Sequence, residues 1–157
     1  MPVTVEWDNE EKTVVRMRLD GNWTWDEVYP ASQEGYAMLE SVSYVVDLIM
    51  DMRQSRGIPN SSIFHARNTI GKRHPRTGLT VFVGANTLFF TIWRVFNRVY
   101  ASLRVEQQFT FADKIEEARE MLAKHHASRS GDKETAKTGD AEAGTAAAEQ
   151  GTGQSNG

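Results

Sequence analysis

The sequence contains no cysteine among its 157 residues, which excludes disulfides, thiolate zinc sites and thiol nucleophiles. It also has no excess of basic residues: the net charge is -3, which argues against binding nucleic acid through its phosphate backbone. No apolar run approaches the roughly 20 residues that a membrane span needs. The N-terminus lacks the basic and apolar regions of a signal peptide, so we expect a cytoplasmic protein without a membrane span.

The last part of the chain lacks large apolar residues altogether. From residue 127 to 157 there is no Val, Ile, Leu, Met, Phe, Tyr or Trp, and Gly, Ala, Ser, Thr and Glu dominate. Such a segment cannot bury enough apolar surface to offset the entropy lost on ordering. We therefore predict one folded domain over residues 1–126 and a disordered low-complexity tail over 127–157.

The folded part is organised around the stretch from Val45 to Ser62. Residues 45–52 form a nearly continuous apolar run rich in strand-forming residues, which is typical of a strand covered on both faces. An Arg, Ser, Gly and Pro segment then breaks regular structure. Asn60, Ser61 and Ser62 follow, and each of these residue types can cap a helix. The pattern predicts a central strand, a loop and a capped helix.

Periodicity predicts the remaining elements. Alternating residues at 3–7 and 15–19 indicate a hairpin, and Thr24 with Glu27 fits a capping box at the start of a helix. Pro30 either kinks the first turn of that helix or marks its beginning. Further along, the sequence predicts a helix at 61–72, a strand at 79–83, a helix at 87–103, a strand at 105–109 and a last helix from Thr110.

This order, ββαβαβαβα, predicts an α/β fold. Strands that alternate with helices after an opening hairpin imply a mixed, mostly parallel sheet with helices packed on it. We therefore expect a single domain of this architecture.

The order, together with the strand 45–51 that leads through a loop to a serine-capped helix, resembles the STAS domain of sulfate transporters and anti-sigma-factor antagonists. In that family a switch serine at the start of the second helix is phosphorylated, and this controls binding to a partner kinase or regulator. The resemblance places the strand-end aspartate at Asp51 and the switch serine at Ser61 or Ser62. Pro59 and Asn60 replace the family's usual acidic residue, and Ile63 replaces its usual glycine.

A serine at a helix N-terminus suits a phosphoswitch, because the helix dipole and free amides accept the added charge. The alternative is that Asn60 or Ser61 simply caps the helix. Asp51, Ser61 and Asn86 each follow the C-terminal end of a predicted parallel strand. We expect them near one edge of the sheet, where α/β folds commonly place ligand sites.

The helix predicted at 87–103 is apolar over most of its circumference. One stripe is aliphatic and the adjacent stripe is aromatic, with Phe89, Trp93, Phe96 and Tyr100. Because this exceeds what one sheet face covers, we expect the aromatic stripe to form a homodimer or partner surface. The alternative is a groove for a lipid or another apolar ligand.

Other polar groups indicate no catalytic site. The loop that contains Lys72, Arg73, His74 and Arg76 reads as a solvated helix end, and the alternative is a contact with phosphate or an acidic partner. His65 reads as a surface or satisfied residue. The pair His125 and His126 lies at the end of the last helix. We expect no enzyme activity, no metal and no cofactor. The predicted function is a STAS-like regulatory domain that binds a protein partner or itself; the alternative is an apolar-ligand or lipid-binding module.

Overall fold

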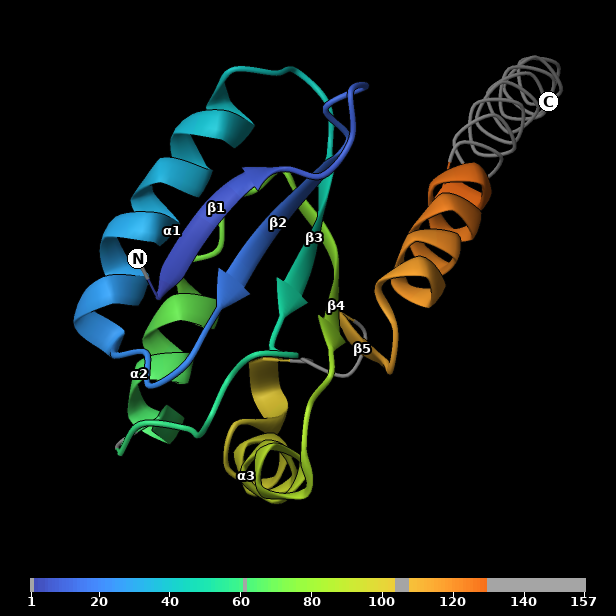
Figure 1. Cartoon of the computed structure of the whole chain (residues 1–157). Helices are drawn as coiled ribbons and strands as arrows, with labels where there is room; N and C mark the ends of the chain where they lie inside the picture. Colours follow the sequence, from blue (N-terminus) through green and yellow to red (C-terminus); the bar gives the residue numbers. More distant parts are fainter. Residues whose placement is uncertain (1, 61, 104–107, 130–157) are drawn as a thin grey trace, which may run out of the picture. The chain divides into compact units, whose positions relative to one another are not determined.

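The computed structural model describes residues 2–60, 62–103 and 108–129. The chain divides into two units, Met1–Leu122 and Ala123–Gly157, and each is described by itself. The first unit contains a five-stranded sheet with strand order β1-β2-β3-β4-β5 (Figure 1). The strands are β1 (Val3–Trp7), β2 (Val14–Leu19), β3 (Val46–Asp51), β4 (Thr77–Val83) and β5 (Phe109–Ala112).

The connections confirm the predicted fold class. Strands β1 and β2 form an antiparallel hairpin, whereas β2 to β5 are parallel to one another. The described helices are α1 (Trp25–Glu40), α2 (Ser62–Gly71), α3 (Thr87–Val99) and the short 3-10 helix η1 (Ala101–Leu103). With helical residues 115–122 the order is ββαβαβαβα, and β3 is the central strand.

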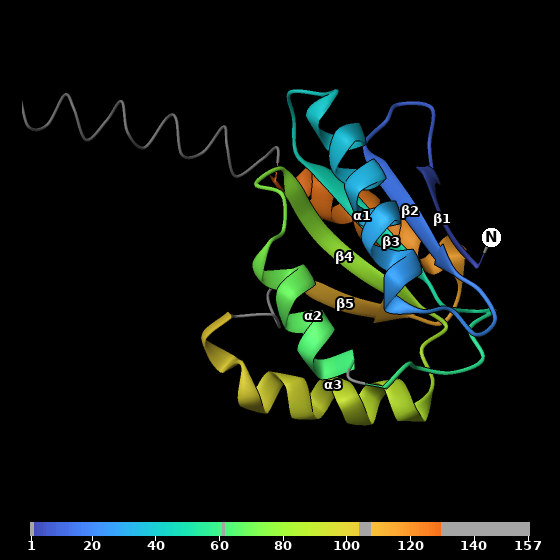
Figure 2. The ribbon, with the colours of Figure 1, turned by 90° about the vertical axis from the view of Figure 1, so that its left-hand side faces the viewer.

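Two residue sets alternate along the central strands and face opposite sides of the sheet. On β3, Leu48 and Met50 point to the side of α1 and α2, and Ile49 points to the other side. Figure 2 shows α1 and α2 in front of the sheet, with α3 along its lower edge in that view.

The far side of the sheet is covered by the helical residues 115–122. Their apolar residues Ile115, Ala118 and Leu122 pack on Ile49 and Val81 in one cluster with little exposed surface. A side-chain contact adds to this packing, since Arg119 donates two hydrogen bonds of 2.9 Å to the carboxylate of Asp8.

Helix α1 begins at Trp25, after Thr24 as its N-cap, which agrees with the predicted capping box. The backbone N–H of Thr24 donates to Oε2 of Glu27 at 2.8 Å. Pro30 lies inside the helix, so the alternative in which the helix begins at Pro30 is wrong.

The end of the first unit differs from the sequence prediction. The fifth strand is Phe109–Ala112, whereas we predicted 105–109, of which residues 105–107 lie outside the described residues. The last helix starts at residue 115, because Thr110 and Phe111, predicted as its first turn, pair with β4 instead. Helix α3 also stops earlier than predicted, at Val99, before η1.

In the second unit, residues 123–129 are helical. The predicted tail begins at residue 127, and from residue 130 onward it lies outside the described residues. No described helix is long and apolar enough to span a membrane.

Candidate functional site

An apolar cavity of about 190 Å³ lies between the sheet and the three helices α1, α2 and α3. The sheet forms its floor through side chains of all five strands. Its lining includes Val5, Val15, Met17, Leu19, Leu48, Met50, Thr80, Phe82 and Phe109 from the strands. Almost every lining group is a hydrocarbon or aromatic surface, so the cavity is suited to an apolar guest.

Small residues on the helices leave this space open. Gly35 on α1 and Ala66 on α2 both line the cavity, opposite the large side chains of the sheet. A Cβ atom on Gly35 would lie 3.7 Å from Cγ2 of Val5, so the helix approaches the hairpin closely at this point. The small side chains at Gly35 and Ala66 therefore leave space that larger residues at these positions would fill.

Helix α3 closes one side of the cavity with aromatic rings. Phe89 and Trp93 pack against Phe82 of β4, with ring centroids 4.8 and 5.6 Å apart, and Trp93 lies 5.1 Å from Phe109. Phe96 is only 2% exposed. Three residues of the predicted aromatic stripe therefore face the sheet and the cavity.

The fourth member of that stripe, Tyr100, lies at the end of α3. Its ring packs on Phe96 at 4.9 Å, and the guanidinium of Arg67 lies 5.5 Å from its centroid. The exposed large apolar residues of α3 are instead Leu88, Phe90, Val95 and Val99, between 39% and 59% exposed, whereas Ile92 of the aliphatic stripe lines the cavity. The aromatic stripe faces inward because its flat rings stack on the phenylalanines of β4 and β5.

Of the two switch candidates, Ser61 lies outside the described residues, and Ser62 begins α2 with 8% of its surface exposed. The Ser62 hydroxyl donates to the carbonyl of Pro59 and accepts a bond of 3.1 Å from Nε1 of Trp25. It therefore joins the start of α2 to α1. Asn60, beside it, is exposed in the preceding turn.

Asp51 ends β3, where its buried carboxylate is bound by Arg53. Nε and Nη2 of Arg53 donate to it at 2.9 and 2.8 Å, and the backbone N–H of Arg53 adds a bond of 3.2 Å. Burial alone would raise the pKa of Asp51, but the hydrogen bonds and charge of Arg53 outweigh it and lower that pKa. Asn86 caps α3 by accepting from the N–H of Phe89 at 2.9 Å.

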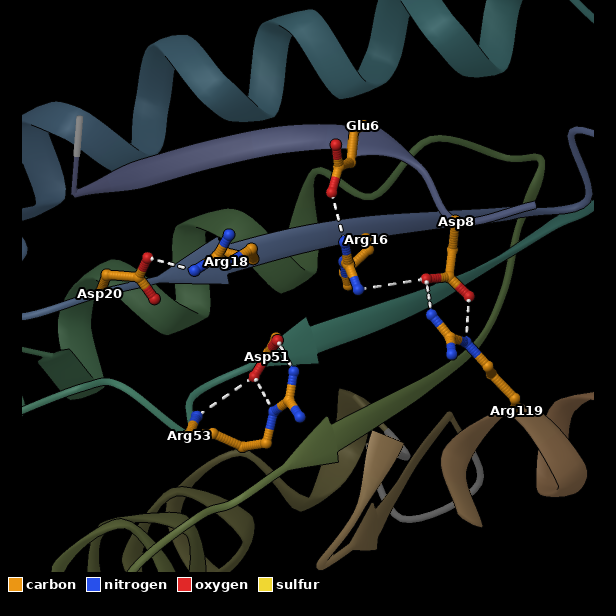
Figure 3. A network of polar contacts seen from close by, with 8 residues as sticks. All are labelled: Glu6, Asp8, Arg16, Arg18, Asp20, Asp51, Arg53 and Arg119. Carbon is orange, nitrogen blue, oxygen red and sulfur yellow. Dashed lines mark hydrogen bonds and ion pairs between the residues drawn. The ribbon is translucent and has the colours of Figure 1, made fainter. Parts of the chain in front are cut away.

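Asp51 and Ser62 do not converge on one site. Ser62 lines the cavity, whereas the Asp51 side chain lies on the opposite side of the sheet from Met50, within the polar surface drawn in Figure 3. Gly84, at the end of β4, does lie beside Arg53. The carboxyl edge of the sheet thus carries a satisfied ion pair and a helix cap.

Figure 3 shows that this polar surface extends along the hairpin. Arg16 pairs with Glu6 and lies 3.5 Å from Asp8, which also binds Arg119. Arg18 pairs with Asp20 at 2.9 Å. Each carboxylate of this surface that the figure draws has an arginine partner, so the surface holds structural ion pairs.

Arg73, in the loop after α2, is a functional candidate that the sequence did not distinguish from the other basic residues of its loop. We expected this loop to be a solvated helix end, but Arg73 turns inward and contributes to the cavity lining. Its burial lowers its pKa. Lys72, Arg73 and Arg76 are equivalent in sequence, so only the packing of the loop on β4 distinguishes them.

His65 and His126 have side-chain partners. Nδ1 of His65 lies 2.6 Å from the hydroxyl of Tyr29, and its ring stacks on Trp25 at 5.1 Å, which agrees with a satisfied residue. His126 lies 3.1 Å from Arg129. Within the described residues no group of three or more His, Cys, Asp or Glu side chains is arranged to hold a metal ion.

Comparison with known proteins supports the fold. No family model and no curated protein sequence matches the chain. Among solved structures it is similar to an uncharacterized protein of the DUF3478 family from Shewanella loihica PV-4, described as having a SpoIIAA-like fold. The TM-score is 0.54 at 13% identity, over 76% of this chain and 91% of the other. The chain has a SpoIIAA-like α/β fold, as the resemblance to STAS domains implied.

Proposed function

We propose that this domain binds a small apolar ligand in the cavity between the sheet and α1, α2 and α3. The observation that carries the proposal is the lining, which brings hydrophobic side chains of five strands and three helices around one unfilled space. Well-packed interiors leave few voids larger than a water molecule, and an apolar void sacrifices dispersion contacts. A ligand that fills the space restores those contacts.

The size of the cavity limits the ligand. An apolar cavity of about 150 Å³ accommodates benzene. The cavity here, at about 190 Å³, is larger and therefore suits a ligand of roughly six to ten non-hydrogen atoms. A complete phospholipid is too large for this space, whereas a short acyl chain or a single substituted ring fits.

We propose a binding role without catalysis. Ser62 is a hydroxyl in the lining, but it is engaged by Trp25 and by the carbonyl of Pro59. His65, the histidine of α2, is bound to Tyr29 and stacked on Trp25. Neither group is arranged as a nucleophile with its base.

Intrinsic fluorescence tests the proposal directly, because Trp23, Trp25 and Trp93 all line the cavity. Titration with 1-octanol or toluene is expected to give a saturable change in tryptophan emission and a rise in melting temperature. Ala66→Phe places a ring in the cavity and is expected to weaken binding at least about tenfold without destabilising the fold.

Ala37→Phe is the matched control, because Ala37 lies on the exposed face of α1 and outside the lining. It is expected to bind both probes as the wild type does. The proposal fails if the wild type shows no saturable response, or if Ala66→Phe and wild type bind both probes equally.

A second candidate, protein interaction, is favoured by the exposed surface of α3. Leu88, Val95 and Val99 form an exposed apolar stripe on this helix, and Phe90 adds a further exposed apolar side chain. We propose that this stripe, rather than the aromatic one, would contact a regulator or a second copy of the chain. Sedimentation of Val95→Asp against wild type tests self-association. Binding of a regulator or kinase is tested by pull-down from the native host, together with phosphopeptide analysis of Ser61 and Ser62.

A further inference from the structure

Arg73 is the one charged residue in the described lining of the cavity. It follows α2, and its guanidinium is held against the start of β4. Nη2 donates to the carbonyl of Gly78 at 2.6 Å and to Oγ1 of Thr80 at 3.1 Å, and Nη1 donates to Oε1 of Gln108 at 2.7 Å. The ring of Phe109 lies 4.8 Å from its central carbon. These contacts fix the position of the guanidinium.

No carboxylate among the described residues pairs with Arg73, whereas each arginine drawn in Figure 3 pairs with one. All three acceptors of Arg73 are neutral. A guanidinium has five N–H donors, so three bonds leave two without an acceptor in the described part of the chain. A buried charge normally has a counterion, because desolvation without one is costly.

Other hydroxyl groups mark the same end of the cavity. Tyr36 of α1 and Thr77 of β4 are also part of the lining. The Tyr36 hydroxyl donates to the carbonyl of Lys72 at 2.5 Å, next to Arg73 in the chain. The charge of Arg73 partly offsets the burial that raises the pKa of Tyr36. The rest of the floor and the α3 wall are apolar, so the cavity has one cationic, polar end.

We propose that the ligand of this cavity is a small monocarboxylic acid whose carboxylate binds Arg73 and whose hydrocarbon part lies against Met50, Phe82 and Trp93. This inference rests on the proposed function, since it assigns a chemical class to the guest of the same cavity. The carboxylate supplies the counterion that Arg73 lacks among the described residues. It accepts a charge-assisted hydrogen bond from one of the two donors, on Nε and Nη1, that the contacts above leave unused.

Charge and size select this class over others. A single guanidinium balances one negative charge, whereas a phosphate dianion would leave one charge buried without a partner. A neutral alcohol leaves the arginine without a counterion, and an amine adds a second cation. The space corresponds to roughly ten non-hydrogen atoms, which matches an acid of about eight carbons.

The test compares three probes of equal chain length, octanoate, 1-octanol and octylamine, by tryptophan fluorescence and calorimetry at pH 7.5. Octanoate is expected to bind at least about tenfold more tightly than 1-octanol, because charge-assisted hydrogen bonds are stronger than neutral ones. Octylamine is expected to bind most weakly. Arg73→Gln should remove the preference for octanoate and leave the affinity for 1-octanol within about twofold.

Arg76→Gln is the matched control. Arg76 belongs to the same loop, but it lies outside the lining and donates to the carbonyl of Leu39 at 3.4 Å. It should retain the wild-type preference. If Arg73→Gln does not fold, as judged by circular dichroism, Arg73→Lys keeps the charge and is expected to keep a reduced preference for octanoate.

The binding results distinguish a failure of the carboxylate assignment from a failure of apolar binding itself. Three results would overturn the carboxylate assignment while apolar binding stands. They are equal affinity of the wild type for octanoate and 1-octanol, a stronger affinity for octylamine, and an unchanged preference for octanoate in Arg73→Gln. Failure of all three probes to bind overturns both. An octanoate preference that depends on Arg73 but not on Arg76 supports the inference.

Discussion

The two faces of the sheet use the same strands for different purposes. On the face toward residues 115–122, Ile49, Val81 and Leu122 are completely or almost completely buried and fill the interior. On the face toward α1, α2 and α3, neighbouring residues of the same strands, such as Met50 and Phe82, border an unfilled cavity. One face therefore supplies stability through dense packing, while the other gives up some packing and provides a binding space.

The two faces of the sheet also differ in how their charged side chains are paired. On the polar surface in Figure 3 the acidic side chains pair with arginines, and the carboxylate of Asp8 contacts both Arg16 and Arg119. The cavity face holds one arginine, Arg73, with neutral partners. A paired charge is a structural contact, whereas the half-buried charge of Arg73, with only neutral partners in the described part of the chain, has capacity left for a ligand.

The largest expected effect comes from truncating the packed face. Ile49→Ala should lower the free energy of unfolding by about 3 to 4 kcal/mol, because it removes a fully buried side chain from a packed cluster and leaves a cavity there. Met50→Ala, one residue away on the cavity face, should cost about 1 to 2 kcal/mol, since its side chain already borders open space. Chemical denaturation measures both values. Equal losses would contradict the difference in packing between the faces.

The next largest loss of stability is expected from a substitution at Gly84, which follows β4. Its φ is +73°, and a Cβ atom there would lie 2.7 Å from Cγ of Arg53, so Gly84→Ala should cost about 2 to 3 kcal/mol. Gly21 has a φ of +59° with nothing within 4 Å, and Gly21→Ala should cost about 1 kcal/mol. Denaturant titration of both variants measures how much the contact between the added Cβ and Arg53 contributes to the loss of stability. A larger loss of stability for Gly21→Ala than for Gly84→Ala would contradict this interpretation.

Breaking one ion pair should have a smaller effect. Arg119→Met leaves the buried Asp8 carboxylate with Arg16 alone at 3.5 Å, and should destabilise the fold by about 1 to 2 kcal/mol. Arg18→Met breaks a more exposed pair with Asp20 and should cost less than about 0.5 kcal/mol. Thermal melts at low and high salt distinguish the two. The interpretation is wrong if Arg18→Met is as damaging as Arg119→Met.

The smallest expected effect concerns pH. The pKa of Asp51 is lowered in the folded state, so the Asp51–Arg53 pair stabilises the fold fully above the unfolded pKa of about 3.9. That stabilisation is lost as the pH falls from there through the folded pKa. Since Arg53 is 41% exposed, solvent screening keeps the contribution modest. Stability curves between pH 6 and pH 2 should be shallower for Asp51→Asn, and parallel curves would rule this out.

The order of elements could be predicted because hydrophobic periodicity is a local property. The runs at 45–52 and 79–83 gave two parallel strands at nearly the observed positions, and Thr24 with Glu27 gave the start of α1. The prediction was wrong at residues 109–112, where an apolar segment short enough for either structure joins the sheet by pairing with β4. Such pairing depends on residues distant in sequence, so no local pattern shows it.

The sequence by itself determined the α/β class, the strand order along the chain and the existence of two apolar stripes on α3, because alternation and helical spacing follow from backbone geometry. The tertiary structure alone decided which stripe faces inward, where the helices leave a cavity and that Arg73 rather than Lys72 or Arg76 reaches it. These features depend on how helices pack over strands far away in sequence, where small residues such as Gly35 and Ala66 meet large ones.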